Sequence, residues 1–324
     1  MSKGFWKKLK KPILVMAPMA NVTDMIFRQI VASCAKPDVF WTEFVSVDGL
    51  CSIGKEKLMK GLRFNKKERP IVAQFFGKDP KKFIIAVKIA KKLKFDGIDI
   101  NMGCPDKKVI KQGAGADLIL NPKLAKKIIL SVKKEAGNLP VSVKTRIGYY
   151  QYEKKEFKKW LENLLSAKPD AIIIHGRTRK MMYAGEADWQ AIKFAVEIVK
   201  NYNQKNKTDI LILGNGDVKS LNDAYNKICK SGVDGVMIGR QILNNPWFFR
   251  KKEKKISFQD KKNILLKHIA FFEKQVGKNQ DFNSLKKYFK SYISGFKNAK
   301  DLRIKLMMTK NIKEARGVIK NYKS

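Results

Sequence analysis

The 324-residue sequence is poor in the residues that build metal centres and disulfide frameworks. It contains only four cysteines and two histidines. The cysteines, Cys34, Cys51, Cys104 and Cys229, are far apart and form no C-x-x-C pair. This spacing argues against a zinc site and against a disulfide scaffold. We therefore expect a cytoplasmic protein that holds no metal.

The sequence also lacks a long hydrophobic run. None approaches the roughly 18 apolar residues that a membrane-spanning helix requires. The apolar stretch at 13–20 follows a lysine-rich segment, as in a signal peptide, but Pro18 interrupts it. We interpret this stretch as a strand and expect no association with a membrane.

Acidic residues and arginine are scarce as well. The chain has 29 Asp and Glu against 69 Lys and Arg, which gives a formal net charge of +40, and only 10 of the basic residues are arginine. Such a charge favours a polyanionic partner. Bidentate recognition of phosphates and bases favours arginine, however, so part of the lysine excess also fits compositional drift.

The sequence does contain a regular alternation of short apolar runs and amphipathic stretches. Its eight apolar runs are nearly continuous, which is typical of parallel strands covered by helices. They are Ile13–Ala17, Val39–Glu43, Ile71–Phe75, Gly97–Asn101, Val141–Thr145, Ala171–His175, Ile210–Gly214 and Gly235–Gly239. The stretches between them that have helical periodicity include Lys81–Leu93, Leu124–Ala136, Glu156–Leu165, Trp189–Tyr202 and Leu221–Lys230.

Eight strand–helix units over about 240 residues fit an α/β fold, the (β/α)8 TIM barrel. A doubly wound sheet is the alternative, but it usually has fewer strands and a glycine-rich turn after the first one. Here Ala17-Pro18-Met19-Ala20 follows the first run, without a G-x-G-x-x-G pattern. The TIM barrel is therefore the favoured fold.

The character of the chain changes at about Lys251, where strand-like runs end. Lys261–Lys274, Phe282–Phe296 and Lys300–Lys320 have the periodicity of amphipathic helices. Residues 250–324 carry a net charge of +16 over 75 residues, against +24 over the other 249. Compositional drift alone would spread the excess of lysine evenly along the chain. We therefore predict a barrel domain over 1–250 and a basic, all-α domain over 251–324.

Catalytic residues of TIM barrels lie at the carboxyl ends of the strands. Two glycine motifs, Gly214-Asn215-Gly216-Asp217 and Gly239-Arg240, follow the seventh and eighth strands. Glycines let the backbone approach a phosphate, and loops after these two strands are the usual phosphate site of such barrels. The motifs therefore predict a phosphorylated substrate or cofactor.

Three side chains at other strand ends suggest chemistry. Cys104 lies in a Gly–Pro frame, and a thiol near its usual pKa of about 8.5 is mostly protonated, so it is a plausible proton donor. Lys144 lies within an apolar strand, where a lysine is costly unless it meets an anion or an acceptor. His175 ends the sixth strand and faces the same mouth. We interpret His268, in the helical tail, as structural.

On these residues the sequence resembles the tRNA-dihydrouridine synthases, flavoenzymes that reduce uridine in tRNA. The resemblance covers about residues 12–250, and the tail matches only in kind and position. Five groups of motifs match in order: Ala17-Pro18-Met19-Ala20 with Thr23-Asp24 and Phe27-Arg28; Gln74-Phe75-Phe76-Gly77; Asn101-Met102-Gly103-Cys104-Pro105 with Gln112-Gly113-Ala114-Gly115; His175-Gly176-Arg177-Thr178-Arg179 with Tyr183-Ala184-Gly185 and Ala187-Asp188-Trp189; and Gly214-Asn215-Gly216-Asp217 with Gly239-Arg240.

The resemblance implies FMN as the cofactor and assigns residues to it. Pro18, Met19 and Ala20 would surround the flavin, and Gln74 and Lys144 would lie at its pyrimidine edge. The phosphate end would be held by Asn215, Gly216, Asp217, Gly239 and Arg240. Cys104 would be the catalytic acid, His175 would face the flavin, and Asn101, Arg177 and Arg179 would bind the substrate.

The implied reaction reduces uridine to 5,6-dihydrouridine in tRNA. Hydride from the reduced flavin adds at C6 because C5=C6 is conjugated to the C4 carbonyl, and Cys104 gives a proton to C5. NADPH would re-reduce the flavin by transient binding, since no Rossmann fingerprint is present. The uridine must leave the tRNA stack, while the basic tail holds the tRNA backbone. We expect a monomer.

Two other functions share some of these features. One is a flavin barrel that acts on a small molecule, such as a dihydroorotate or dihydropyrimidine dehydrogenase, which would need neither the basic tail nor the His-x-Arg-Thr-Arg motif. The other is a non-catalytic RNA-binding protein, which would have no need of Cys104, Lys144 and the phosphate loops.

Overall fold

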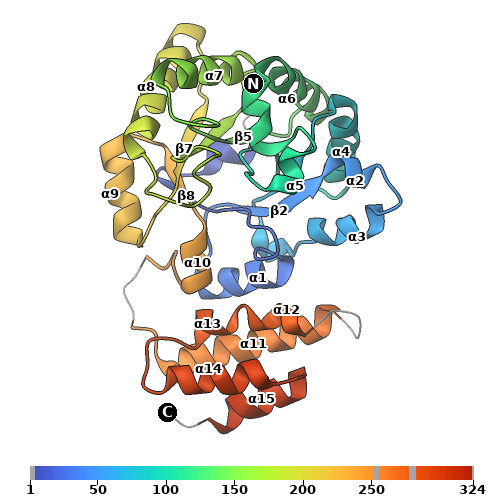
Figure 1. The fold of residues 1–324 in the computed structure, drawn as a ribbon, viewed down its shortest axis with the longest axis vertical. Coiled ribbons are helices and arrows are strands. Elements are labelled where there is room, and N and C mark those ends of the chain that lie inside the picture. The colour runs from blue at the N-terminus through green and yellow to red at the C-terminus, as the bar shows by residue number, and fades with distance from the viewer. Residues whose placement is uncertain (1–3, 252–254, 277–281, 323–324) are drawn as a thin grey trace. The chain divides into compact units, whose positions relative to one another are not determined.

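The computed structural model describes residues 4–251, 255–276 and 282–322, and the chain divides into two compact units (Figure 1). The first unit comprises Met1–Thr23 and Pro37–Gly239, and the second comprises Asp24–Lys36 and Arg240–Ser324. Thus a short segment near the amino terminus belongs to the same unit as the tail. The assignment of catalysis to 1–250 and of tRNA binding to 251–324 stays a prediction.

The first unit is a barrel of eight parallel strands. The strands are β1 (Ile13–Met16), β2 (Phe40–Ser46), β3 (Ile71–Phe76), β4 (Gly97–Met102), β5 (Val141–Arg146), β6 (Ala171–His175), β7 (Leu211–Asn215) and β8 (Gly235–Ile238). Their order is β1-β8-β7-β6-β5-β4-β3-β2, and a parallel bridge between Val15 and Val39 joins β1 to β2. The predicted TIM barrel is confirmed.

Five long helices of this unit surround the strands in Figure 1: α4 (Pro80–Lys92), α6 (Pro122–Ala136), α7 (Lys154–Ser166), α8 (Trp189–Asn206) and α9 (Leu221–Ser231). Local signals set their ends. Asp79 and Asn121 cap α4 and α6 with a side-chain oxygen, and each is followed by a proline, which suits the first helical position. Gly232 ends α9 in the left-handed conformation.

Short helical turns occupy the connections. They are η1 (Gly4–Lys8), α2 (Val47–Leu50), α3 (Lys55–Met59), η2 (Lys60–Leu62), η3 (Lys66–Glu68), α5 (Lys107–Ile110) and η4 (Gly115–Leu120). Several follow the carboxyl ends of strands, where the loops of a TIM barrel form its active site.

The inside of the barrel has an apolar part and a polar part. Alternate residues of each strand point inward. Twelve buried residues form the apolar cluster: Trp6, Ile13, Val15, Ala17, Val39, Trp41, Val72, Ala171, Ile173, Leu211, Leu213 and Met237. Burying each large side chain contributes about 1.5–3 kcal/mol. Toward the carboxyl ends of β3 to β7, polar residues replace this packing, and they form the site described below.

The second unit is helical. It contains α1 (Met25–Cys34), α10 (Arg240–Asn244), α11 (Phe258–Val276), α12 (Asn283–Lys286), α13 (Phe289–Tyr292), α14 (Ala299–Met308) and α15 (Ile312–Asn321). Helix α1 packs against α11. The Phe27 ring stacks on Tyr288 at 4.9 Å between centroids, and the Tyr288 hydroxyl donates to Asp24.

Two helices predicted in the tail are wrong in extent. Phe282–Phe296 holds two single turns, because main-chain N–H groups of Tyr288 and Ser291 bond to carbonyls three residues back. Lys300–Lys320 holds two helices, because Asn311 caps α15. Its side chain accepts from the Glu314 N–H, and the Glu314 carboxylate accepts from the Lys310 N–H. The N-x-x-E spacing resembles a capping box, a signal present in the sequence.

His268 is structural, as predicted. Its side chain is fully buried in the helical unit, and its Nδ1 lies 2.6 Å from the Tyr292 hydroxyl. Burial lowers the pKa of His268 to about 3, so the ring is neutral at physiological pH.

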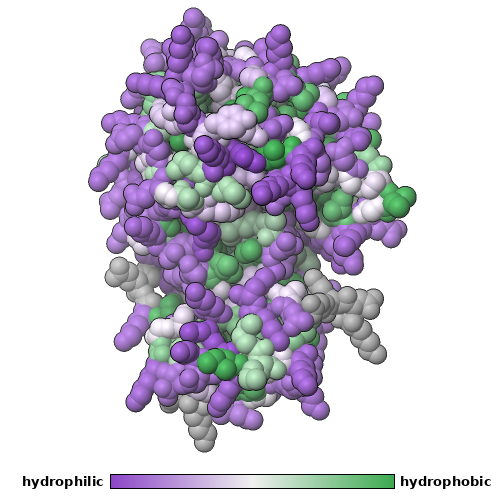
Figure 2. Space-filling model, viewed as in Figure 1, coloured by the Kyte–Doolittle hydropathy of each residue, from purple (hydrophilic) through white to green (hydrophobic). Residues whose placement is uncertain are grey.

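Hydrophilic side chains cover most of the visible face of each unit in Figure 2, with small separate apolar areas between them. Among the described residues, no helix is both long and apolar enough to span a membrane.

Candidate functional site

The polar part of the barrel interior consists of three neighbouring rows set by the strand register. Gln74, Asp99 and Ser142 are paired across β3, β4 and β5. Two residues nearer the carboxyl ends of the strands, Asn101 pairs with Lys144. At the ends, Arg146, His175 and Asn215 are paired across β5, β6 and β7. Because residues two apart on a strand share a face, these side chains point to the same interior.

The loop that carries Cys104 is held by hydrogen bonds from this interior. The Asn101 side-chain oxygen accepts from the main-chain N–H groups of Gly103 at 3.1 Å and Cys104 at 2.8 Å. The Arg146 Nε donates to the Gly103 carbonyl at 2.7 Å. A Cβ atom on Gly115 would stand 2.8 Å from the Cys104 carbonyl oxygen, so this close approach requires glycine. The loop therefore presents the thiol in a fixed place.

The Cys104 thiol is nearly buried, with a relative exposure of 9%. Burial raises its pKa, and this effect outweighs the opposing hydrogen bond from the main chain at Asp106 and the positive charges of Arg146 and Lys144. A thiol with a raised pKa keeps its proton at neutral pH. Cys104 is thus suited to give a proton rather than to attack as a thiolate.

Lys144 and Arg146 bring two cations close to this thiol. Lys144 is partly exposed, and burial lowers its pKa to about 8, with further lowering by Arg146 and an opposite effect of Asp99. Its amine therefore remains largely protonated at pH 7. Arg146 is buried, and its NH1 donates to the main-chain carbonyls of Thr178 and Met182. Burial lowers the pKa of Arg146 to about 10, which leaves it charged.

Asp99 is a buried carboxyl group in the middle of this arrangement. It accepts from the Gln74 Nε2 at 2.6 Å and from the Ser142 hydroxyl at 2.5 Å. Burial raises its pKa to about 6 against the effect of these bonds and of Lys144. The sequence interpretation missed Asp99. The signal that could have found it is an acidic residue two positions before Asn101 in a strand that is otherwise apolar.

The loop after β6 is built around the buried Arg177. Its guanidinium donates to the carbonyls of Ala184 and Gly185 and, at 2.6 Å, to the Asp217 carboxylate. Its NH1 lies 3.4 Å from the His175 Nε2. Arg177 therefore supports His175 and joins the β6 and β7 loops. Its predicted contact with substrate stays a prediction.

The loop after β7 is held by hydrogen bonds and by close packing. The Asn215 amide donates to the Met237 carbonyl at 2.7 Å, which fixes β7 against β8. Gly216 has a φ of +127°, and a Cβ there would stand 2.5 Å from the Ala187 Cβ. The Asp217 carboxylate is turned to Arg177 and the Ala187 N–H. The Asp217 carboxylate is thus engaged within the protein, and the predicted role of this loop at a phosphate stays a prediction.

The remaining predicted residues are placed as follows. Pro18 and Met19 are partly buried and Ala20 is exposed, and the Thr23 hydroxyl oxygen accepts from the Met19 N–H at 2.9 Å. A Cβ on Gly239 would lie 3.7 Å from the Met19 Sδ. Arg240 is exposed and begins α10 of the second unit, and the Arg179 guanidinium lies over the Tyr149 ring at 5.3 Å. Their predicted roles stay predictions.

Comparison with known proteins identifies the family. The sequence pattern described as dihydrouridine synthase (Dus) matches residues 15–323. The chain belongs to the dihydrouridine synthase family. This assignment confirms the resemblance, and it disfavours both the small-molecule flavin dehydrogenases and a non-catalytic RNA-binding protein as alternatives.

Relatives within the dihydrouridine synthase family match along their whole length. The chain is 38% identical to a probable tRNA-dihydrouridine synthase of Staphylococcus aureus (strain COL), over 100% of this chain and 97% of the relative. It is 36% identical to a probable tRNA-dihydrouridine synthase 2 of Bacillus subtilis (strain 168), over 99% of this chain and 97% of that one.

Solved structures add information on the fold alone. A 2-naphthoyl-CoA reductase in complex with 2-naphthoyl-CoA superposes with a TM-score of 0.53 at 11% identity, over 74% of this chain and 49% of that chain.

The part of this dihydrouridine synthase that the structure describes contains no cluster of three or more His, Cys, Asp or Glu residues arranged to hold a metal ion. The titratable groups of the mouth are instead one thiol, two cations, one histidine and the buried Asp99, a set suited to proton transfer and anion binding.

Proposed function

We propose that this dihydrouridine synthase reduces uridine to 5,6-dihydrouridine in tRNA, with FMN as its cofactor and NADPH as reductant. The observation that carries the proposal is the convergence of a protonated Cys104 thiol and the Lys144 cation at one barrel mouth. Asn101 links the positions of Cys104 and Lys144. It is the register partner of Lys144 in the sheet, and its side-chain oxygen accepts from the Cys104 N–H.

The residues at the mouth fit FMN at both ends of that molecule. At one end, Gly216 has a φ of +127°, which favours glycine, and main-chain groups of its loop, with Asn215 and Asp217 beside it, would hold the phosphate. At the other end, Lys144 offers a cation, while the fully buried Gln74 amide bonds to Asp99 and Asn101 and would act on the flavin edge through these neighbours. Pro18, Met19, Ala20, His175, Gly239 and Arg240 would complete the site. When bound, FMN would supply the hydride that adds at uracil C6.

Cys104 supplies the proton in this proposal. As negative charge develops toward C5 and O4 of the uracil, the Sγ–H group delivers its proton to C5. Burial keeps the thiol protonated until then, and the Asn101 and Arg146 bonds to its loop hold Sγ in position. A fixed donor needs little reorganisation in the transition state.

Lys144 and the loop arginines supply positive charge. Lys144 would lie at the pyrimidine edge of the flavin, where its cation would stabilise negative charge. We place Arg177 and Arg179 on the substrate side with Asn101. The Arg177 guanidinium already donates to acceptors on Ala184, Gly185 and Asp217, so its contribution there is to shape the loop and support His175.

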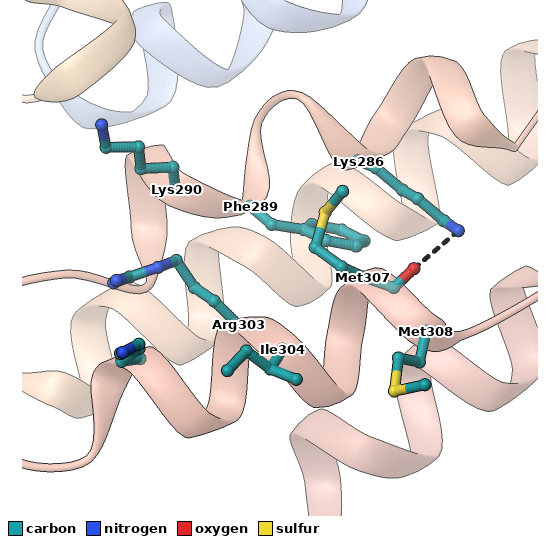
Figure 3. A pocket seen from close by; sticks show the side chains of 8 residues that line it. Lys286, Phe289, Lys290, Arg303, Ile304, Met307 and Met308 are labelled. Carbon is teal, nitrogen blue, oxygen red and sulfur yellow. Dashed lines mark hydrogen bonds between the residues drawn. The ribbon is translucent and has the colours of Figure 1, made fainter.

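A groove in the helical unit supports tRNA as the partner. It has a volume of about 540 Å³ and lies between α12–α13 and α14 (Figure 3). Its lining contains four cations and four apolar side chains and no carboxylate: Lys286, Lys290, Lys300 and Arg303, with Phe289, Ile304, Met307 and Met308.

Two of the four cations that line this groove donate to main-chain carbonyls, and two are exposed. The Lys286 amine donates to the Met307 carbonyl at 2.9 Å, and the Arg303 NH1 donates to the Ile293 carbonyl at 2.6 Å. Lys290 and Lys300 are exposed. Figure 3 shows Lys290 and Arg303 extending to the side opposite the Lys286 amine. Such a cationic rim suits phosphates of an RNA backbone.

The test of the proposal is reconstitution with defined components. The purified protein should be yellow, should release FMN on denaturation, and should form dihydrouridine in unmodified tRNA when NADPH is added, as measured by mass spectrometry of nucleosides. A colourless protein that cannot be reconstituted with FMN would contradict the flavin proposal. A yellow protein that reduces free pyrimidines but no tRNA would favour a small-molecule enzyme instead.

A further inference from the structure

We propose that Asp99 is a positioning residue of this site, which fixes the amide orientation of Gln74 and thereby the place of the Cys104 loop. The inference rests on the proposed function for its catalytic meaning. Its geometric part concerns the protein alone.

A continuous chain of hydrogen bonds leads from Asp99 to Cys104. The Asp99 Oδ2 accepts from the Gln74 Nε2 at 2.6 Å, so the other end of that amide, Oε1, is turned to accept from the Asn101 Nδ2 at 3.1 Å. The Asn101 Oδ1 is thereby directed to the N–H groups of Gly103 and Cys104. In this series of hydrogen bonds, the orientation of each side-chain amide is determined by the donor or acceptor group of its neighbour.

The carboxylate fixes this orientation from one end of the series of bonds, and the main-chain N–H groups of Gly103 and Cys104 fix it from the other. An amide can turn by 180° and exchange its donor and acceptor ends, whereas an ionised carboxylate only accepts. If Gln74 turned, its oxygen would face the Asp99 oxygen, and its nitrogen would face the Asn101 amide nitrogen. Gln74 and Asp99 are both fully buried, so water cannot compensate for two such unmatched contacts.

The charge of Asp99 also acts on Lys144, which lies on the same face of β5 as Ser142, the register partner of Asp99, and two residues beyond it. The groups that face the Asp99 carboxyl are Gln74 on β3, Ser142 and Lys144 on β5, and the Trp41 indole on β2, which lowers the pKa of Asp99. Lys144 is the only cation among them, and Asp99 raises its pKa against the effects of burial and of Arg146. Loss of this negative charge should therefore make the Lys144 amine lose its proton at lower pH.

Two substitutions at this position separate geometry from charge. In Asp99→Asn the remaining side-chain oxygen can still accept from Gln74, while the new amide nitrogen faces the Ser142 hydroxyl, which can also accept. The orientation of Gln74 is kept and the charge is lost. In Asp99→Leu both are lost. Ser142→Ala is the matched control, because it removes the other bond to Asp99 and leaves the one from Gln74.

The geometric readout is alkylation of Cys104 in the full-length protein, followed by peptide mass spectrometry so that other cysteines do not interfere. We expect Asp99→Leu to change the alkylation rate of Cys104 by at least about tenfold, because its loop loses a fixed support. Asp99→Asn and Ser142→Ala should stay within about threefold of the original chain. Equal rates in all four proteins would overturn the positioning role.

The electrostatic readout is the affinity for FMN as a function of pH. For Asp99→Asn, we expect the loss of affinity at alkaline pH to begin about one pH unit lower than in the original chain. An unchanged profile would overturn the action on Lys144. If Asp99→Leu does not fold, Asp99→Asn still tests the charge, and Gln74→Leu tests the geometry through Cys104 alkylation.

Catalysis provides the third readout. For Asp99→Leu, kcat for tRNA reduction should fall by at least about tenfold while KM for tRNA changes less than about twofold, since the substrate-binding surface is intact. The alkylation experiment needs neither FMN nor tRNA. A protein that fails to make dihydrouridine but shows the alkylation pattern would contradict the proposed function and leave the positioning role of Asp99 standing.

Discussion

The barrel mouth and the helical unit use positive charge in different ways. At the mouth, burial lowers the pKa values of Lys144 and Arg146, and Arg146 donates to three main-chain carbonyls. In the helical unit, Lys290 and Lys300 are exposed at the rim of an apolar groove. A net charge of +40 therefore has two meanings. The cations at the mouth suit the proposed chemistry, and the many exposed ones suit a polyanionic partner.

The largest effect that this comparison predicts is on the binding of FMN. Lys144→Met should weaken FMN affinity about 10- to 100-fold, because a charge-assisted contact contributes about 1.5–3 kcal/mol. Fluorescence titration with FMN measures it. Lys133→Met is the matched control. Lys133 is also partly buried, but it donates to the Lys168 carbonyl, which precedes the amino end of β6 and so lies away from the mouth. Equal losses in both variants would contradict a specific role for Lys144.

The second prediction concerns pH. The Lys144 amine has a pKa of about 8 and loses its proton as the pH rises through that value. FMN affinity should therefore begin to fall above about pH 8. It should level off only when the pH exceeds the pKa of Lys144 in the FMN complex, which bound FMN would raise. Lys144→Met should bind FMN weakly and show little of this dependence. A fall at alkaline pH that persists in Lys144→Met would place its origin elsewhere.

The third prediction concerns the helical unit. Replacing Lys290 and Lys300 by alanine should weaken tRNA binding by up to about tenfold and reduce the slope of log affinity against log salt by up to about 1.5, while FMN affinity stays the same. Filter binding at several salt concentrations measures both. Lys127 and Lys134, two exposed lysines of α6, are the control pair. If the control pair has the same effect, the exposed charge acts without a preferred surface.

The smallest predicted effect concerns the stability of the helical unit. Asn311→Ala removes the cap of α15 and should cost about 1 kcal/mol of unfolding free energy, whereas Asn311→Asp should keep the cap. Urea unfolding measures the difference. FMN affinity should be unaffected by either change, and a loss of FMN in Asn311→Ala alone would show that the site depends on this helix.

The fold could be predicted well from the sequence for a physical reason. Parallel strands are covered on both faces, so each one is a nearly continuous apolar run, and β3, for example, was expected at Ile71–Phe75 and lies at Ile71–Phe76. Helix ends in the tail were predicted poorly, because the apolar periodicity continues across Asn311, whereas α14 ends at Met308 and the Asn311 side chain caps the start of α15. The membership of α1 in the helical unit depends on tertiary packing alone.

The site could be predicted only in part. Lys144 and Cys104 stand out because a cation in an apolar strand and a thiol in a Gly–Pro frame are unusual. Asp99 was missed because its importance comes from strand register, which places it beside Gln74 and Ser142. Arg177 was assigned to substrate, whereas its side chain is engaged with Asp217 and two loop carbonyls, contacts that no local pattern reveals.

The most direct test of the account is a single turnover of the reduced, FMN-loaded protein on unmodified tRNA, compared between the original chain, Cys104→Ala and Cys229→Ala. Cys229 is an exposed cysteine and serves as the control. We predict that Cys104→Ala retains FMN and NADPH oxidation but forms dihydrouridine at least about 100-fold more slowly, while Cys229→Ala is unchanged. Dihydrouridine formation at the original rate by Cys104→Ala would contradict the proposed proton transfer.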